Sequence, residues 1–238
     1  MKQKKIPIFL LASLLFLLTF SGCGSSVPDE FKGKLMAPYI EKVMDGKYTY
    51  ESSALGDTEN KTTFTKVSNE KIMITIATKD TTAVLMRNGD NYYIVSPAQF
   101  AYTDATGDTK KQIAAYTTSL SIDNWKTGSF VEEGTCTVQG VEYSYEDYYI
   151  AVTQKRTRFL FNQDKKLALV CNVQEDGTIE EYLTMNIYAA SEQSFEQLNQ
   201  YHYYSSDGTS QTKTKAETES KTAENGKESA KKSEKAGN

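Results

Sequence analysis

Between residues 46 and 187, apolar side chains recur at every second position in short runs that turn-forming residues separate. One run holds Ile72, Ile74 and Ile76, and the sequence Asn88-Gly89-Asp90 interrupts the pattern further along. Period two is typical of a β-strand with one buried face, and short gaps between strands favour antiparallel neighbours. The pattern therefore predicts an antiparallel sheet with strands near residues 48–50, 61–67, 72–76, 92–95, 125–131, 135–138, 141–152, 157–162, 167–174 and 178–187.

Two segments have helical spacing instead. Residues 28–45 carry apolar side chains at intervals of three to five, with Pro38 as a point where we expect a kink and Gly46 as the end. Residues 108–120 form the second predicted helix, which interrupts the strands. The expected fold class is α+β, with one domain over residues 28–204.

The N-terminus has the composition of an export signal. Three lysines within the first five residues precede residues 6–20, which carry no charge and are rich in Leu and Phe. This stretch is shorter than the roughly 20 apolar residues that a membrane-spanning helix needs. We interpret residues 1–22 as a signal peptide that is removed.

The residues that follow resemble the bacterial lipobox. Ser21 and Gly22 stand directly before Cys23, although Phe20 replaces the usual Leu. The resemblance implies a diacylglycerol on the Cys23 thiol, which is the one cofactor-like group expected, with residues 23–27 as a tether. Acyl chains contribute about 0.8 kcal/mol per buried methylene, so two or three of them hold a protein on a membrane. The alternatives are an ordinary secretory signal with an incidental Cys23, or an uncleaved anchor.

Charge excludes some partners. Residues 24–204 hold 17 Lys and Arg against 25 Asp and Glu, a net charge of −8, which argues against nucleic-acid binding. Residues 205–238 are rich in Lys, Glu, Ser and Thr and have no apolar side chain larger than Ala, so we expect a disordered tail. Because Lys outnumbers Arg 24 to 3, we expect a Gram-positive bacterium and a location on the outer face of its membrane.

The order of these elements resembles the LolA and LolB lipoprotein-carrier superfamily and the similar LppX and LprG lipoproteins. The shared local features are Gly46-Lys47-Tyr48-Thr49, Asn88-Gly89-Asp90-Asn91-Tyr92-Tyr93-Ile94, Val138-Gln139-Gly140-Val141-Glu142-Tyr143-Ser144-Tyr145-Glu146 and Phe159-Leu160-Phe161. The resemblance implies a strongly curved antiparallel sheet, an incomplete β-barrel whose concave apolar face is covered by helices and holds acyl chains.

Large side chains in the strand-like runs are the candidates for lining such a cavity. They are Ile72, Ile74, Ile76, Tyr143, Tyr145, Phe159 and Phe161. The alternative is a filled core. Trp125 and the tyrosines near residue 145 also suit a surface that stacks on sugars or peptides, and alternation places Tyr148 on the face opposite Tyr143 and Tyr145.

We find no pattern that indicates catalysis or a metal. His202 is the only histidine, which is too few for an ordinary zinc site. The adjacent acidic pairs, such as Glu132-Glu133, would point to opposite faces of a strand. Cys136 and Cys171 are either a disulfide or two buried thiols, since export permits a disulfide but the sequence does not fix the geometry.

We therefore expect a lipid-anchored, non-catalytic protein that binds a hydrophobic or amphiphilic ligand. The alternative is a protein-interaction module of a cell-envelope complex, with a filled core and an exposed strand edge or aromatic patch.

Overall fold

The computed structural model describes residues 26–205 and 210–211. The predicted signal peptide, Cys23 with its lipid, and most of the predicted tail lie outside these residues. No described helix is long and apolar enough to cross a membrane.

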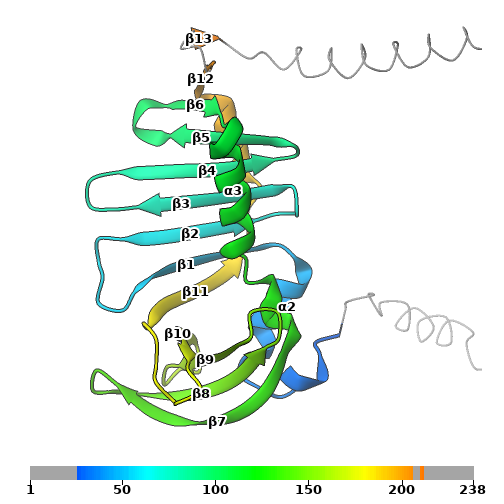
Figure 1. Cartoon of the computed structure of the whole chain (residues 1–238), viewed down its shortest axis with the longest axis vertical. Helices are drawn as coiled ribbons and strands as arrows, with labels where there is room; N and C mark the ends of the chain where they lie inside the picture. The colour runs from blue at the N-terminus through cyan, green and yellow to red at the C-terminus, as the bar shows by residue number, and fades with distance from the viewer. Residues whose placement is uncertain (1–25, 206–209, 212–238) are drawn as a thin grey trace, which may run out of the picture.

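The described strands form one sheet of 13 strands in the order β13-β12-β6-β5-β4-β3-β2-β1-β11-β10-β9-β8-β7 (Figure 1). Neighbouring strands are antiparallel, except that β12 runs parallel to β6. The strands are β1 (Tyr48–Ala54), β2 (Lys61–Lys66), β3 (Lys71–Ala77), β4 (Thr82–Asn88), β5 (Asn91–Ser96), β6 (Ala101–Asp104), β7 (Gly128–Val138), β8 (Val141–Ile150), β9 (Lys155–Phe161), β10 (Leu167–Val173), β11 (Leu183–Ala189), β12 (His202–Tyr204) and β13 (Ser210–Gln211).

The chain builds this sheet as two arms. The first arm, β1 to β6, runs strand by strand from the middle of the sheet toward one end. Helix α3 (Gly107–Ser119) and the 3-10 turn η3 (Asp123–Thr127) then carry the chain to β7, the other edge. The second arm, β7 to β11, returns to the middle, where β11 pairs with β1. The sheet is strongly curved and does not close, which confirms the predicted α+β class with an unclosed, mostly antiparallel sheet.

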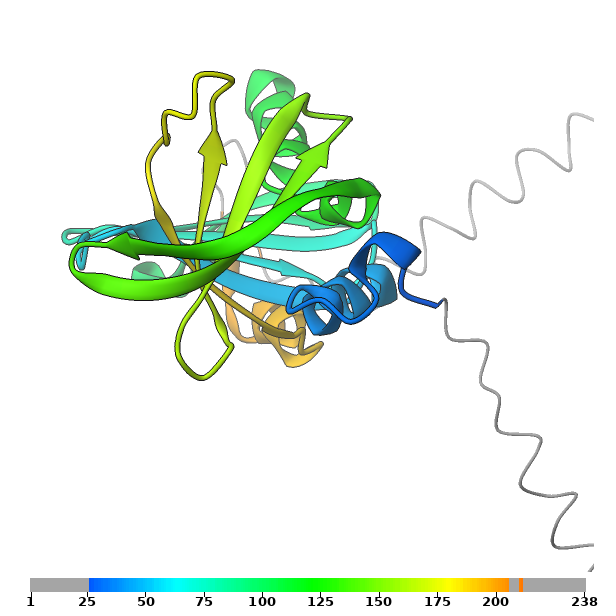
Figure 2. The same cartoon turned by 90° about the horizontal axis from the view of Figure 1, so that it is seen from below.

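The helices lie on both sides of the first arm. Figure 2 shows α3 and the second arm on one side, which we call the concave face, and the short helix α4 (Gln193–Glu196) on the other. The 3-10 turn η2 (Pro97–Gln99) connects β5 to β6, and the 3-10 turn η4 (Gln197–Gln200) stands between α4 and β12.

The first predicted helix is shorter than expected. The segment opens with the 3-10 turn η1 (Asp29–Phe31), and helix α2 (Ala37–Asp45) begins one residue before Pro38. Proline fits the first turn of a helix because the amide hydrogen it lacks would have no helical partner there. Pro38 therefore starts the helix and does not kink it. Gly46 ends α2 at φ +71°, a left-handed conformation that suits glycine.

Several predicted strand boundaries are wrong. Trp125 lies in η3 and not in a strand, and the two runs predicted over residues 125–138 form the single strand β7 with a bulge between Phe130 and Glu132. Residues 178–182 lie outside β11, and an isolated bridge pairs Ile179 with Val173. The predicted helix over residues 108–120 is confirmed within one residue.

Three groups of buried side chains hold the fold together. The main core fills the concave face near α2 and includes Phe31, Met36, Ile40, Tyr48, Phe64, Tyr148 and Phe159. A second group, Val138, Leu160, Leu169 and Cys171, lies on the opposite face of the second arm, since Leu160 and Leu169 alternate with the core residues Phe159 and Val170. In a third group, Phe195 of α4 packs against Val67 and Met86.

Candidate ligand-binding pocket

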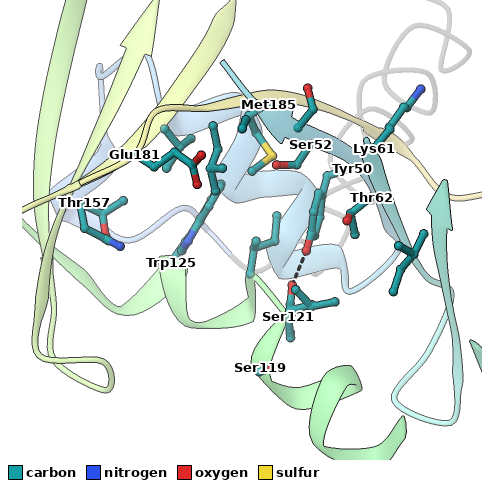
Figure 3. A pocket seen from close by; sticks show the side chains of 18 of the residues that line it. Tyr50, Ser52, Lys61, Thr62, Ser119, Ser121, Trp125, Thr157, Glu181 and Met185 are labelled. Carbon is teal, nitrogen blue, oxygen red and sulfur yellow. Dashed lines mark hydrogen bonds between the residues drawn. The ribbon is translucent and has the colours of Figure 1, made fainter. Parts of the chain in front are cut away.

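A pocket of about 830 Å³ opens on the concave face, beside the main core. Its walls come from the far ends of β1, β2 and β3, from the α3 to η3 connection, and from β8 to β11. This volume lies in the range of about 300–1,000 Å³ that is usual for small-molecule sites. Figure 3 shows side chains from both arms and from the η3 segment reaching into it.

The pocket exists because small side chains occupy the concave face at this end. Ser52 of β1 stands across from Thr62 of β2, and Thr62 stands across from Ile76 of β3. Two residues earlier on β1, the same face carries Tyr50 against Phe64, with ring centroids 5.4 Å apart. The step from aromatic rings to hydroxyl side chains leaves space that no side chain fills.

The inner wall is apolar. It is formed mainly by Tyr50, Leu120, Trp125, Ile150, Val170 and Met185. Trp125 is the only tryptophan of the chain, and its ring meets Phe159 of the main core edge-on at 4.7 Å. An apolar ligand segment placed here would bury its surface against these side chains.

Hydrogen bonds from β1 fix the wall that carries Trp125. The Tyr50 hydroxyl donates to the Leu120 carbonyl at 2.7 Å, drawn as a dashed line in Figure 3, and the Tyr48 hydroxyl donates to Asp123 at 3.1 Å. Lys66, whose side chain is almost fully buried, forms an ion pair with the other Asp123 oxygen. Burial raises the pKa of Tyr48 and of Tyr50, so both hydroxyls keep their protons and remain donors.

Asp123 is the charged centre of this wall. Burial alone acts to raise its pKa, but the hydrogen bonds from Lys66 and Ser121 together with the Lys66 charge outweigh burial and lower it. Asp123 is therefore ionised when it holds Lys66 and Tyr48.

Charged side chains stand at the mouth of the pocket. Lys61 pairs with Glu51 at 2.6 Å, and Lys155 pairs with Glu180 at 3.4 Å. The Asp57 carboxylate accepts hydrogen bonds from the amides of Glu59 and Asn60, both at 2.9 Å. The lysines thus already have carboxylate partners.

The predicted ligand-lining residues do not share one cavity. Ile72, Ile74, Phe159 and Phe161 are buried in the main core, and only Ile76 lines the pocket. Tyr143 and Tyr145 belong to the second group on the opposite face, because Tyr145 pairs with Leu160 while Glu146 pairs with Phe159. Of the seven candidates, the structure therefore brings Ile76 alone to the pocket: register places Tyr143 and Tyr145 on the other face, and core packing buries the remaining four.

The sequence reasoning missed most of the pocket. Ser52, Thr62 and Thr157 line it although none is a typical cavity residue, and Trp125 was expected in a strand. The loss of large side chains along β1 and β2 is visible in the sequence, but locating it required the strand register.

Cys136 and Cys171 are free thiols in the structure. Cys136 lies on the edge strand β7 and Cys171 on β10, with β8 and β9 between them in the sheet. The disulfide alternative is therefore not formed here, and burial raises the pKa of both thiols, that of Cys171 to about 12.

Near them, Asp147 is fully buried and holds Arg158 at 2.8 Å and also Arg156. These ion pairs neutralise the buried charge of Asp147 on the face of the second arm opposite the main core, so the role of Asp147 is structural.

Within residues 26–205 and 210–211, no group of three His, Cys, Asp or Glu side chains is arranged to hold a metal ion. His202 is exposed on β12.

No protein-family model matches the sequence, and no curated protein does either. Matches among solved structures include a DUF1329 family protein from Desulfovibrio piger, with 11% identity, a TM-score of 0.32, and coverage of 69% of this chain and 92% of that chain. A chain from the complex of Pseudomonas aeruginosa MucA and MucB has 13% identity and a TM-score of 0.30, covering 67% of this chain and 58% of that one. A LolA superfamily protein from Nitrosomonas europaea has 8% identity and a TM-score of 0.28, covering 61% and 84%.

Proposed function

We propose that this chain is a lipid-anchored protein on the outer face of the cell membrane that binds an amphiphilic ligand and catalyses no reaction. The observation that carries the binding proposal is the pocket of about 830 Å³ between the two arms. Its inner wall, which includes Trp125 and Met185, suits the apolar part of such a ligand, and its polar mouth suits the head group. The lipobox resemblance at Cys23 supports the anchor.

Ligand binding can be measured with a chain that starts at residue 23 and carries Cys23→Ser, purified without detergent. Mass spectrometry of its organic extract reports any lipid that copurifies. Because Trp125 is the only tryptophan and lines the pocket, its fluorescence reports added ligand directly. We expect titration with 1-monolauroylglycerol to change the Trp125 emission and to saturate.

A matched pair of variants separates pocket binding from surface adsorption. Thr62 and Thr63 are neighbours on β2, but only Thr62 lines the pocket. Thr62→Phe fills the space with a ring, so we expect affinity to fall at least about tenfold, while Thr63→Phe on the opposite face leaves it unchanged. Equal binding by both variants, or a filled core that takes up no lipid, would overturn the proposal and favour a protein-interaction module.

The anchor has its own test in the full-length chain. With Cys23 intact we expect the protein in the membrane fraction of a Gram-positive host, with the mass of a diacylglycerol on Cys23, and Cys23→Ser should lack that added mass. An intact protein without the added mass would contradict a lipid anchor.

A further inference from the structure

The mouth of the pocket carries an excess of negative charge. Four charged side chains line it, Asp57, Lys61, Lys155 and Glu181, and the two lysines already pair with Glu51 and Glu180. Once these two ion pairs are counted as neutral, Asp57 and Glu181 remain as the two lining carboxylates that no lysine pairs with.

Three carboxylates around the pocket, those of Glu51, Glu180 and Asp57, are held in the ionised form. The hydrogen bond from Lys61 lowers the pKa of Glu51, and hydrogen bonds from Asn172 and Lys155, together with the Lys155 charge, lower that of Glu180. Hydrogen bonds from Asn60 do the same for Asp57. Glu181 is exposed and, within the described residues, has no hydrogen-bond or ion-pair partner, so its charge is open to a ligand.

Neutral polar groups without partners lie in the same pocket. The side chains of Ser52, Thr62 and Asn124 line it and form no hydrogen bond with other described residues. Figure 3 shows Ser52 and Thr62 on β1 and β2 near Lys61. Hydroxyl and amide groups both donate and accept, and so pair well with ligand hydroxyls.

We propose that the pocket selects an amphiphile whose head group carries hydroxyls and no negative charge, and that it disfavours anionic head groups. The inference rests on the proposed binding function and names the ligand class for the same site. An anionic head group at the mouth would meet unpaired Glu181 and find both lysines already engaged by carboxylates. A neutral hydroxylated head group avoids this repulsion and bonds to Ser52, Thr62 and Asn124.

The test compares two probes with the same acyl chain, 1-monolauroylglycerol and laurate, titrated against Trp125 fluorescence at pH 8 below their micelle concentrations. We expect the neutral probe to bind about tenfold more tightly at low salt, and the ratio to shrink in 0.5 M NaCl as the charges are screened. If neither probe binds, the proposed function fails. If laurate binds as tightly or more tightly, only the head-group inference fails.

Charge reversal at one position sharpens the result. Glu181→Lys should bring the ratio of the two affinities close to one, mainly by strengthening laurate binding. Glu142→Lys makes the same change at an exposed residue of β8 outside the pocket and should leave the ratio unchanged. An unchanged ratio in Glu181→Lys, or an equal effect of Glu142→Lys, would overturn selection at the mouth.

A cationic probe tests the hydroxyl part of the inference. Dodecyltrimethylammonium has a similar chain but no group that forms hydrogen bonds. We expect it to bind within about tenfold of 1-monolauroylglycerol, since it gains attraction but loses the bonds to Ser52 and Thr62. Much tighter binding of the cation would show that charge alone selects the ligand and would overturn the role of the hydroxyls.

Discussion

The two ends of the concave face use the same three strands, yet one end is closed and the other is open. At the α2 end, Tyr48, Phe64 and Ile72 are buried in the main core. At the other end, the same face of β1, β2 and β3 carries Ser52, Thr62 and Ile76, which line the pocket. Figure 1 shows α2 at one end of these strands only.

The comparison shows that the pocket results from the size of the side chains and not from the pairing of the strands. The strands remain paired through both ends, so their spacing is the same. What changes is the volume that the side chains occupy, from two tyrosines on β1 to Ser52. Protein interiors are normally packed to high density, so an unfilled space of this kind is either occupied by a ligand or filled with solvent.

Ile74 and Ile76 give the most direct way to test this difference. They lie on the same face of β3, but Ile74 is fully buried while Ile76 borders the pocket. Ile74→Ala creates a cavity in packed surroundings and should lower the free energy of unfolding by about 3–5 kcal/mol. Ile76→Ala only enlarges an existing space, so we expect about 1 kcal/mol. Urea denaturation followed by circular dichroism measures both, and equal losses would show that the open end is packed like the closed one.

The sequence predicted the architecture better than the site. The period-two runs and the turn residues Asn88-Gly89-Asp90 identify most strands because alternation and turn propensity are local properties. The role of Pro38 is not predictable in the same way, because a proline that kinks a helix and one that starts it look alike without the neighbouring contacts.

The site depends on register, which is not local. Tyr145 and Phe159 both look like cavity residues in the sequence, but the pairing of β8 with β9 puts them on opposite faces. The pocket also needs β1 beside β11, a contact between segments more than 100 residues apart in the chain. No spacing rule reveals that contact from one sequence.

At the closed end, Glu146 joins the second arm to the start of α2. Its buried carboxylate accepts hydrogen bonds from the amides of Leu35 and Met36, at 2.6 and 3.0 Å, and from the Tyr148 hydroxyl at 3.1 Å. Glu146→Ala leaves these donors buried without an acceptor, so we expect a loss of about 2–3 kcal/mol in the free energy of unfolding.

Glu133 provides the matched control for Glu146. It stands directly across from Glu146 on β7, but it is exposed and pairs with Lys34 at 2.8 Å. Because exposed ion pairs contribute little, Glu133→Ala should cost at most about 1 kcal/mol. If both variants lose the same free energy in urea denaturation, the carboxylate of Glu146 does not fasten α2 to the second arm.

The smallest expected effect is a change in how stability depends on pH, and it concerns the wall that separates the closed end from the pocket. The pKa of Asp123 is lower in the folded chain than in the unfolded chain, because its bonds to Lys66 and Ser121 outweigh the cost of burial. A depressed carboxyl pKa stabilises the fold fully above the unfolded value, about 3.9, and this contribution is lost as the pH falls through the lower folded value. Asp123→Asn should therefore flatten the decline of stability below pH 5, measured as urea midpoints from pH 7 to pH 3. The same variant should also reduce the change in Trp125 fluorescence on ligand binding at pH 7, because Asp123 fixes the segment that carries the tryptophan. If the urea midpoint of Asp123→Asn falls between pH 5 and pH 3 as steeply as that of the unmodified chain, the ion pair of Lys66 and Asp123 stabilises this wall no more than an uncharged pair does.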